Sequence, residues 1–196
     1  MISSTDREVF VLRKYPLLVI EGVDGSGKTT IAKRLSDVRG ALYVKMPKAC
    51  YGWISGAVER LGNRELEAAT YIAITFLSSL HLRWLLRKGP VVCDKYIHTT
   101  LVAQECLGSW LIRLIKPLRY VLVPKPDATF CLTTRSTSEL VRRCEIRGKY
   151  DDNDREMHSM HHRLEMHYAS YPEITMVETD GVSVETVFSY ILNQIE

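Results

Sequence analysis

The chain has 196 residues, a length that suits one folding domain with a substantial core. It is 46% hydrophobic and 25% charged, which excludes a disordered or fibrous protein. The formal net charge of only +3 argues against a nucleic-acid-binding surface, although it leaves room for a local basic pocket that binds a phosphorylated ligand.

Targeting and membrane signals are weak throughout the chain. The first residues, MISSTDREVFVLRKYP, carry charges along their whole length, so we expect no secretory signal. Polar and charged residues interrupt the most apolar stretch, residues 68–84, and this pattern predicts a buried helix, with no membrane partner. Five cysteines without a C-x-x-C pair indicate reduced, mostly buried thiols and a cytoplasmic protein: Cys50, Cys93, Cys106, Cys131 and Cys144.

In chain order, the first expected element is a strand over residues 17–21 (LLVIE), a short apolar run typical of a strand buried on both faces. Helical spacing follows over residues 29–38, and a second strand is expected over residues 41–46. A long helix is expected over residues 65–87. Its middle is apolar around most of its circumference, so it must be covered on several sides, by its own sheet and by a second subunit.

The second half of the chain continues this alternation. Three more buried strands are expected, over residues 90–94, 128–132 and 174–178. Three more helices are expected over residues 136–147, 155–171 and 183–195. Ser136 is the expected N-cap of the first. The alternation predicts an α/β fold, a three-layer sandwich whose five-stranded parallel sheet is flanked by helices. In such sheets ligands bind beyond the carboxyl ends of the strands.

A phosphate-binding motif follows the first expected strand. Gly22, Gly27, Lys28 and Thr29 fill the template G-x-x-x-x-G-K-[ST], with a buried strand before it and a helix after it. The glycines let backbone N–H groups converge on phosphate oxygens, Lys28 reaches the β- and γ-phosphates, and Thr29 can bind Mg²⁺. We therefore expect one domain of the P-loop NTPase type over residues 1–196. Its first 15 residues form a short N-terminal extension. The loop's expected ATP-binding residues are Gly22, Asp24, Gly25, Ser26, Gly27, Lys28, Thr29 and Thr30.

The third expected strand ends in VVCDKYIHTTLVAQ, residues 91–104. Asp94 is a carboxylate at a strand end, placed to hold Mg²⁺ together with Thr29. Lys95 beside it supplies the positive charge that an anionic phosphate acceptor needs. The downstream N-K-x-D of a GTPase is absent, and a helicase would normally need a longer chain, so a small-molecule kinase is favoured.

Two segments resemble the thymidylate kinase family, which carries E-G-x-[DE]-G-x-G-K-T-T and later D-R-Y-x-x-S-x-x-A-Y-Q. This chain has EGVDGSGKTT and DKYIHTTLVAQ, and the likeness continues through Pro124, Pro126 and Asp127 to the last expected strand. It covers nearly the whole chain after residue 15. The resemblance implies a homodimeric enzyme that transfers the γ-phosphate of ATP to dTMP, giving dTDP, with Mg²⁺ bound to ATP.

The resemblance also implies the acceptor site. Lys95 stands where the family has arginine, and the family pattern F-x-x-x-R is not intact, because Leu80 follows Phe76 at that offset. Lys45 and Pro47 lie in the family's turn after the second strand, where Met46 is expected to pack on the nucleotide. The expected acceptor-binding residues are Asp24, Lys45, Pro47, Phe76, Lys95, Thr100 and Gln104.

Basic residues gather around RGKYDDNDRE and predict a mobile lid over about residues 147–155, where Arg147, Gly148, Asp154 and Arg155 match the family's R-x-G…D-R-x-E. The basic cluster consists of Arg142, Arg143, Arg147, Lys149 and Arg155, of which Arg143 is expected to bind ATP. Positioned arginines stabilise the charge that develops during phosphoryl transfer. The expected catalytic residues are Lys28, Asp94, Lys95, Arg147 and Arg155.

Three alternatives stay open. The acceptor could be another nucleotide, or it could be a nucleoside. A nucleoside hydroxyl must lose a proton, so Asp24 or Asp94 would then have to act as a base. The protein could instead be a catalytically weak, ATP-binding regulator. His158, His161 and His162 could form part of a zinc site, but the sequence offers no recognisable third ligand.

Overall fold

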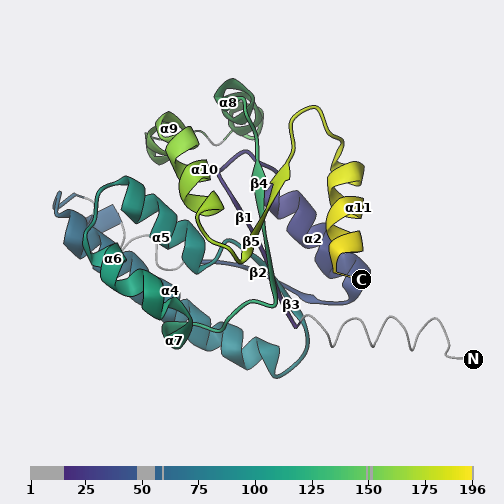
Figure 1. Ribbon diagram of the computed structural model, residues 1–196, viewed down its shortest axis with the longest axis horizontal. Coiled ribbons are helices and arrows are strands. Elements are labelled where there is room, and N and C mark those ends of the chain that lie inside the picture. Colours follow the sequence, from purple (N-terminus) through teal and green to yellow (C-terminus); the bar gives the residue numbers. More distant parts are fainter. Residues whose placement is uncertain (1–15, 48–55, 59, 149, 151, 196) are drawn as a thin grey trace, which may run out of the picture.

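The computed structural model describes residues 16–47, 56–58, 60–148, 150 and 152–195 (Figure 1). Five parallel strands form one sheet in the order β2-β3-β1-β4-β5. Their bounds are Leu17–Gly22 (β1), Leu42–Lys45 (β2), Val91–Asp94 (β3), Ala128–Thr133 (β4) and Ile174–Glu178 (β5). The expected α/β sandwich with a five-stranded parallel sheet is therefore confirmed.

Helices cover both faces of the sheet, as Figure 1 shows. Helices α2 (Lys28–Arg39) and α11 (Val184–Gln194) pack on one face, and α4 (Arg64–Leu86), α5 (Ile97–Cys106) and α10 (His161–Ala169) pack on the other. Alternate residues of β1 supply the two cores: Leu18 and Ile20 face α2 and α11, whereas Leu17 and Val19 belong to the opposite cluster. Burial on both faces explains why β1 and β3 are apolar along most of their length, whereas the edge strand β2 is not buried.

Four elements between β3 and β4 were not expected from the sequence. They are α5, α6 (Leu111–Ile115), the short 3₁₀ helix η2 (Lys116–Leu118) and α7 (Arg119–Leu122). Helix α5 has no polar face to reveal its period, because seven of its ten residues are buried. The other three elements each have five residues or fewer, too short for a periodic pattern.

The single helix expected over residues 155–171 is wrong in one respect. The structure divides it into α9 (Asp152–Ser159) and α10, and Met160 separates them with φ −101° and ψ 11°. The apolar stripe is nevertheless correct: Leu164, Tyr168 and Tyr171 are buried, and Met157 and Met160 pack against the same core. The break lets α9 turn away from α10 while both keep an apolar face on the sheet side.

Four cysteines, Cys93, Cys106, Cys131 and Cys144, are buried free thiols. The expectations for Cys50, Lys149 and residues 1–15 lie outside the described residues. Among the helices described, none combines the length and the apolar character needed to cross a membrane.

Side-chain caps start several helices. Ser136 accepts a hydrogen bond from the Glu139 N–H at 3.2 Å, as expected from the sequence, and α8 then runs from Thr137 to Ile146. Ser183 caps α11 in the same way, accepting from the Thr186 N–H at 3.1 Å. Each cap satisfies an N–H group that has no partner within its own helix.

We predict that Ser183→Ala lowers the free energy of unfolding by about 1 kcal/mol, because the Thr186 N–H loses its acceptor. Urea unfolding monitored by circular dichroism measures the change. Ser189→Ala is the matched control, since Ser189 is an exposed residue inside the same helix and alanine is the better helix former. Equal losses in the two variants would contradict the capping role.

Candidate active site

The phosphate-binding loop connects β1 to α2 at the carboxyl edge of the sheet. Gly22 has φ +130°, and a Cβ atom there would clash with the carbonyl oxygen of Leu132 on the neighbouring strand. Gly27 has φ +95° and occupies the N-cap of α2. Only glycine suits both positions, and the N-terminal end of the 12-residue helix therefore faces the space above the loop.

A row of three charged side chains lies along this loop. The Asp24 carboxylate accepts hydrogen bonds from Lys95 Nζ at 2.8 Å and from Lys28 Nζ at 3.3 Å. Burial alone would raise the pKa of Asp24, but the two ammonium groups more than offset that and hold it well below its usual range. Burial lowers the pKa of Lys28, whereas Asp24 outweighs burial at Lys95 and raises its pKa. Asp24 is thus an ionised link between two cations.

Asp94 lies at the end of β3, fully buried. Its Oδ2 atom accepts hydrogen bonds from the Thr29 hydroxyl at 2.5 Å and from the Tyr43 hydroxyl at 3.0 Å. Its Oδ1 atom is buried and makes no hydrogen bond with any residue that the structure describes. A carboxylate oxygen without a donor, next to a threonine hydroxyl, fits a hard divalent cation such as Mg²⁺.

Glu21 lies near the end of β1, directly before the phosphate loop, and connects this strand to the start of α5. Its carboxyl group is fully buried and accepts from the backbone N–H groups of Tyr96 and Thr99 and from the Thr99 hydroxyl. Burial raises its pKa to about 7, and the Thr99 hydrogen bonds and the nearby Lys28 and Lys95 oppose this only in part. Glu21 therefore joins β1 to the start of α5 and fixes the segment that carries Lys95.

A first cavity of about 550 Å³ lies on the α4 and α5 side of the loop. It contains the Lys95 side chain and the Asp24 side of the phosphate loop, and Pro47 follows a cis peptide bond at its edge. Of the expected acceptor residues, the structure brings together in its lining Asp24, Pro47, Lys95, Thr100 and Gln104.

Several other residues line the first cavity and were not expected from the sequence. Helix α4 contributes Arg64, Glu67 and Tyr71, which share one helix face at offsets of three and four. Glu67 accepts a hydrogen bond from the buried Gln104 amide at 3.0 Å. The shared face of these three residues is visible in the sequence. That this face of α4 lies toward α5 is not visible, because α5 itself was not expected.

A second cavity of about 430 Å³ lies on the other side of the loop, between α2, α8 and α11. Of the expected ATP-binding and lid residues, it is lined by Gly25, Ser26, Gly27, Thr30, Arg143 and Arg147. Arg142, from the expected basic cluster, also lines it, as do Thr179 and Val182, which were not expected. Residues 22–24 border the first cavity and residues 25–27 the second, so the phosphate loop separates two neighbouring spaces.

Seven expected residues line neither cavity. Lys28, Thr29 and Asp94 make the contacts described above, and the other four lie elsewhere. Met46 is buried in the core, and Lys45, beside it at the end of β2, is exposed. Phe76 is 38% exposed on the outer side of α4 and lines neither cavity, so the structure does not support its expected contact with the acceptor. Arg155 lies over the Tyr150 ring, with 5.5 Å between its guanidinium carbon and the ring centroid.

The three histidines of the suggested zinc site do not stay together. His158 lies on α9, where its Nε2 atom is 2.8 Å from the Asp24 carbonyl oxygen of the phosphate loop. The turn at Met160 separates it from His161 and His162 on α10. His158 therefore links the lid-side helix to the phosphate loop.

We predict that Glu21 makes the protein less stable as the pH rises. The Glu21 pKa is 4.5 ordinarily and about 7 in the fold, so the folded state binds more protons between these values. The contribution of Glu21 to the free energy of unfolding is therefore complete below about pH 4.5. It decreases between about pH 4.5 and about pH 7, by at most about 1.4 kcal/mol per pH unit. Glu21→Gln, which resembles the protonated acid, should lack this loss when urea unfolding is compared from pH 5 to 8; parallel curves for both proteins would disprove the assignment.

No family model matches the chain. Curated proteins nevertheless support the resemblance to thymidylate kinases that the sequence motifs indicated. Two curated proteins named "Probable thymidylate kinase" align with it over most of both lengths. The protein from Methanococcus aeolicus is 26% identical over 91% of this chain and 94% of its own. The protein from Methanocaldococcus jannaschii is 28% identical over 91% and 95%.

Solved structures share the fold. A thymidylate kinase from Candida albicans superposes with a TM-score of 0.73 at 20% identity, covering 92% of this chain and 91% of that one. A deoxyadenosine kinase from M. mycoides superposes with a TM-score of 0.67 at 15% identity, covering 91% and 98%. The sequence similarity to the two curated proteins extends over nine-tenths of the chain, which is therefore similar to thymidylate kinases in sequence as well as in fold.

Proposed function

We propose that this protein is an ATP-dependent nucleoside monophosphate kinase that transfers the γ-phosphate of ATP to dTMP, giving ADP and dTDP. The observation that carries the proposal is the row Lys28–Asp24–Lys95, which runs from the phosphate loop to the first cavity. Lys95 lines the first cavity, and Lys28 lies buried at the start of α2, beside Asp24. ATP occupies the second cavity and the acceptor nucleotide the first.

Transfer in this arrangement depends on position and charge. An acceptor phosphate is largely ionised near pH 7, because its second pKa is about 6, so its oxygen attacks the γ-phosphorus without a dedicated base. Lys95 offsets the charge of the acceptor phosphate, and Lys28 that of the β- and γ-phosphates. Both lysines must then exchange the Asp24 carboxylate for phosphate oxygens, at least in part.

Magnesium completes the proposed site. Asp94 Oδ1, which makes no hydrogen bond with any described residue, and the Thr29 hydroxyl are the groups that would hold it. When bound, the ion supplies positive charge to the phosphates and orients them. Tyr43 fixes the Asp94 carboxylate through its hydrogen bond to Oδ2, so that Oδ1 keeps its orientation.

Described residues at the two ends of the proposed lid, residues 147–155, border the two cavities. Arg147 lines the second cavity and is held by the Arg143 carbonyl oxygen and the Cys144 sulfur, at 3.2 and 3.0 Å. Glu156 and Met157, directly after the lid, line the first cavity. Closure of this segment would bring Arg147 and Arg155 toward the moving phosphoryl group and exclude water.

A nucleoside kinase is the second candidate, because the deoxyadenosine kinase shares the fold. A hydroxyl acceptor needs a base, and the low pKa of Asp24 makes that carboxylate a poor one. The Lys95 ammonium group lines the acceptor cavity, and a phosphate there would complement its charge. The geometry therefore favours a monophosphate over a nucleoside.

We also propose a homodimer and a cytoplasmic location. Helix α4 exposes a line of apolar side chains at offsets of three and four, and a second copy of the chain would cover them: Phe76, Leu77, Leu80 and Trp84. The described thiols are all reduced, which fits a reducing compartment.

A panel of acceptors with Mg²⁺ and ATP, followed by ADP release, tests the activity. We expect dTMP to be phosphorylated with a kcat/KM about 10⁴-fold above that of thymidine, because thymidine leaves the charge of Lys95 unpaired. Lys28→Ala should lower kcat by about 10²-fold or more and controls for a contaminating kinase. Rapid turnover of thymidine would favour the nucleoside kinase, and ATP binding without turnover of any monophosphate would favour a regulatory protein.

The dimer is tested by Leu80→Glu. A buried carboxylate in the middle of the α4 line should raise the dimer dissociation constant about tenfold or more. Sedimentation equilibrium at several concentrations measures it. Val38→Glu is the matched control, since Val38 is 60% exposed on α2, across the sheet from α4. A wild-type protein that is monomeric at micromolar concentration would overturn the proposal.

A further inference from the structure

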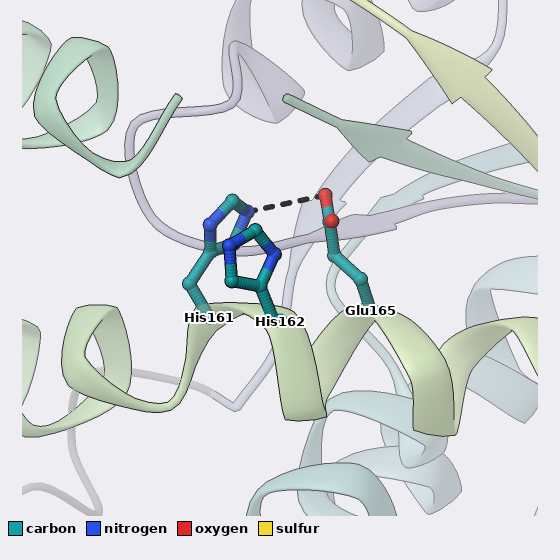
Figure 2. A group of neighbouring side chains, drawn as sticks. All are labelled: His161, His162 and Glu165. Carbon is teal, nitrogen blue, oxygen red and sulfur yellow. Dashed lines mark ion pairs between the residues drawn. The ribbon is translucent and has the colours of Figure 1, made fainter. Parts of the chain in front are cut away.

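A group of metal-ligating side chains lies outside both nucleotide cavities. His161, His162 and Glu165 project from the first turns of α10, and Figure 2 shows both imidazole rings turned toward the Glu165 carboxylate. One ligand atom from each residue lies within 4.8 Å of the others. None of the three lines either cavity, so the nucleotide site does not explain the group.

His161 is already positioned as a ligand. Its side chain is 1% exposed, and its Nδ1 atom lies 3.0 Å from the Thr137 hydroxyl at the start of α8. Its Nε2 atom makes no hydrogen bond, although Glu165 Oε1 is only 3.1 Å away. When a partner holds one ring nitrogen, the tautomer and orientation of the other are fixed, as in histidines that bind metals.

The spacing of these two atoms suits a tetrahedral ion. Zinc binds nitrogen and carboxylate oxygen at about 2.0–2.2 Å, so two such ligands lie about 3.3 Å apart. The 3.1 Å between His161 Nε2 and Glu165 Oε1 is close to that value. Glu165 Oε1 also accepts a hydrogen bond from the Thr134 N–H at 3.1 Å, which holds the carboxylate toward the ring.

His162 distinguishes a metal site from a simple ion pair. The His161–Glu165 ion pair at offset four, with 3.1 Å between Nε2 and Oε1, needs no third residue. The exposed His162 ring instead stacks on His161, with 5.2 Å between centroids, on the same side as the carboxylate. Two imidazoles and one carboxylate form a ligand set that transition metals such as zinc prefer.

We propose that His161, His162 and Glu165 bind a divalent transition metal ion of the zinc class, with water in the fourth position. This site is separate from the magnesium site at Asp94, because imidazole nitrogens suit zinc, nickel or copper, whereas Mg²⁺ prefers oxygen. Thr137 begins α8 and Thr134 follows β4, and both hold ligands of the ion. Binding therefore stabilises the junction between β4, α8 and α10, at the base of the helix that leads to the lid.

The experiment uses the full chain after treatment with a chelator. Zn²⁺ is titrated by calorimetry, and Co²⁺ is added to record the visible absorption that indicates four- or five-coordinate cobalt. We expect one ion per chain, that absorption, and a higher melting temperature with Zn²⁺ in the absence of nucleotide. Because no step uses kinase activity, failure of this proposal would leave the proposed function untouched.

Variants locate the ion. His162→Ala removes an exposed ligand with little effect on folding and should weaken Zn²⁺ binding about tenfold or more. Glu165→Gln should do the same, since a neutral amide is a poorer ligand. His167→Ala is the matched control, because His167 lies on the same helix and pairs with Glu105 instead. Unchanged affinity in His162→Ala, or no bound Zn²⁺ in the wild-type protein, would overturn the site.

Discussion

The contact of the Asp24 carboxylate with two buried or half-buried lysines organises the site. Lys28 is 3% exposed and could not remain a buried cation without a counter-charge. Asp24 supplies that charge and also holds Lys95, which comes from a different strand. One carboxylate thus keeps two cations in place beside the phosphate loop, and under the proposed function substrate phosphates would take over its contacts with them.

This contact depends on the register of the central strands. Ile20 of β1 pairs with Asp94 of β3, so the segments after the two strands leave the sheet at the same level. Lys95 has φ +68°, an uncommon conformation for a residue with a side chain, and Glu21 fixes the next residue through the Tyr96 N–H. The buried Glu21 carboxyl is thus part of the support for Lys95, although it lines neither cavity.

The parts that were predictable from the sequence are those that local chemistry determines. The phosphate loop needs glycine at 22 and 27 because of backbone angles and close contacts, so its function is legible in a short segment. The central strands β1, β3 and β4 are legible because burial makes them largely apolar runs. Ser136 and Ser183 mark helix starts through hydrogen bonds that span only three residues.

The parts that were not predictable depend on contacts between distant segments. Tyr71 and Phe76 both lie on α4, and only the packing of α4 against α5 decides that Tyr71 lines the cavity while Phe76 faces outward. The histidine group is a different case: Glu165 lies at offsets of four and three from His161 and His162, which any helix brings together, and only the separation of His158 depends on the break at Met160. A helix continuous from residue 155 would have kept His158 with them.

The size and charge distribution of the side chain at position 95 also matter for the contact with Asp24. An ammonium group is a compact point charge, whereas guanidinium spreads its charge over a planar fork. Lys95 Nζ reaches Asp24 Oδ2 at 2.8 Å, and Lys28 approaches the other oxygen, so each carboxylate oxygen has one cationic donor. With two positive and one negative side chain, the row carries a net charge of one. A phosphate that enters the first cavity therefore meets a positive row in which Asp24 has already oriented the lysine that must bind it.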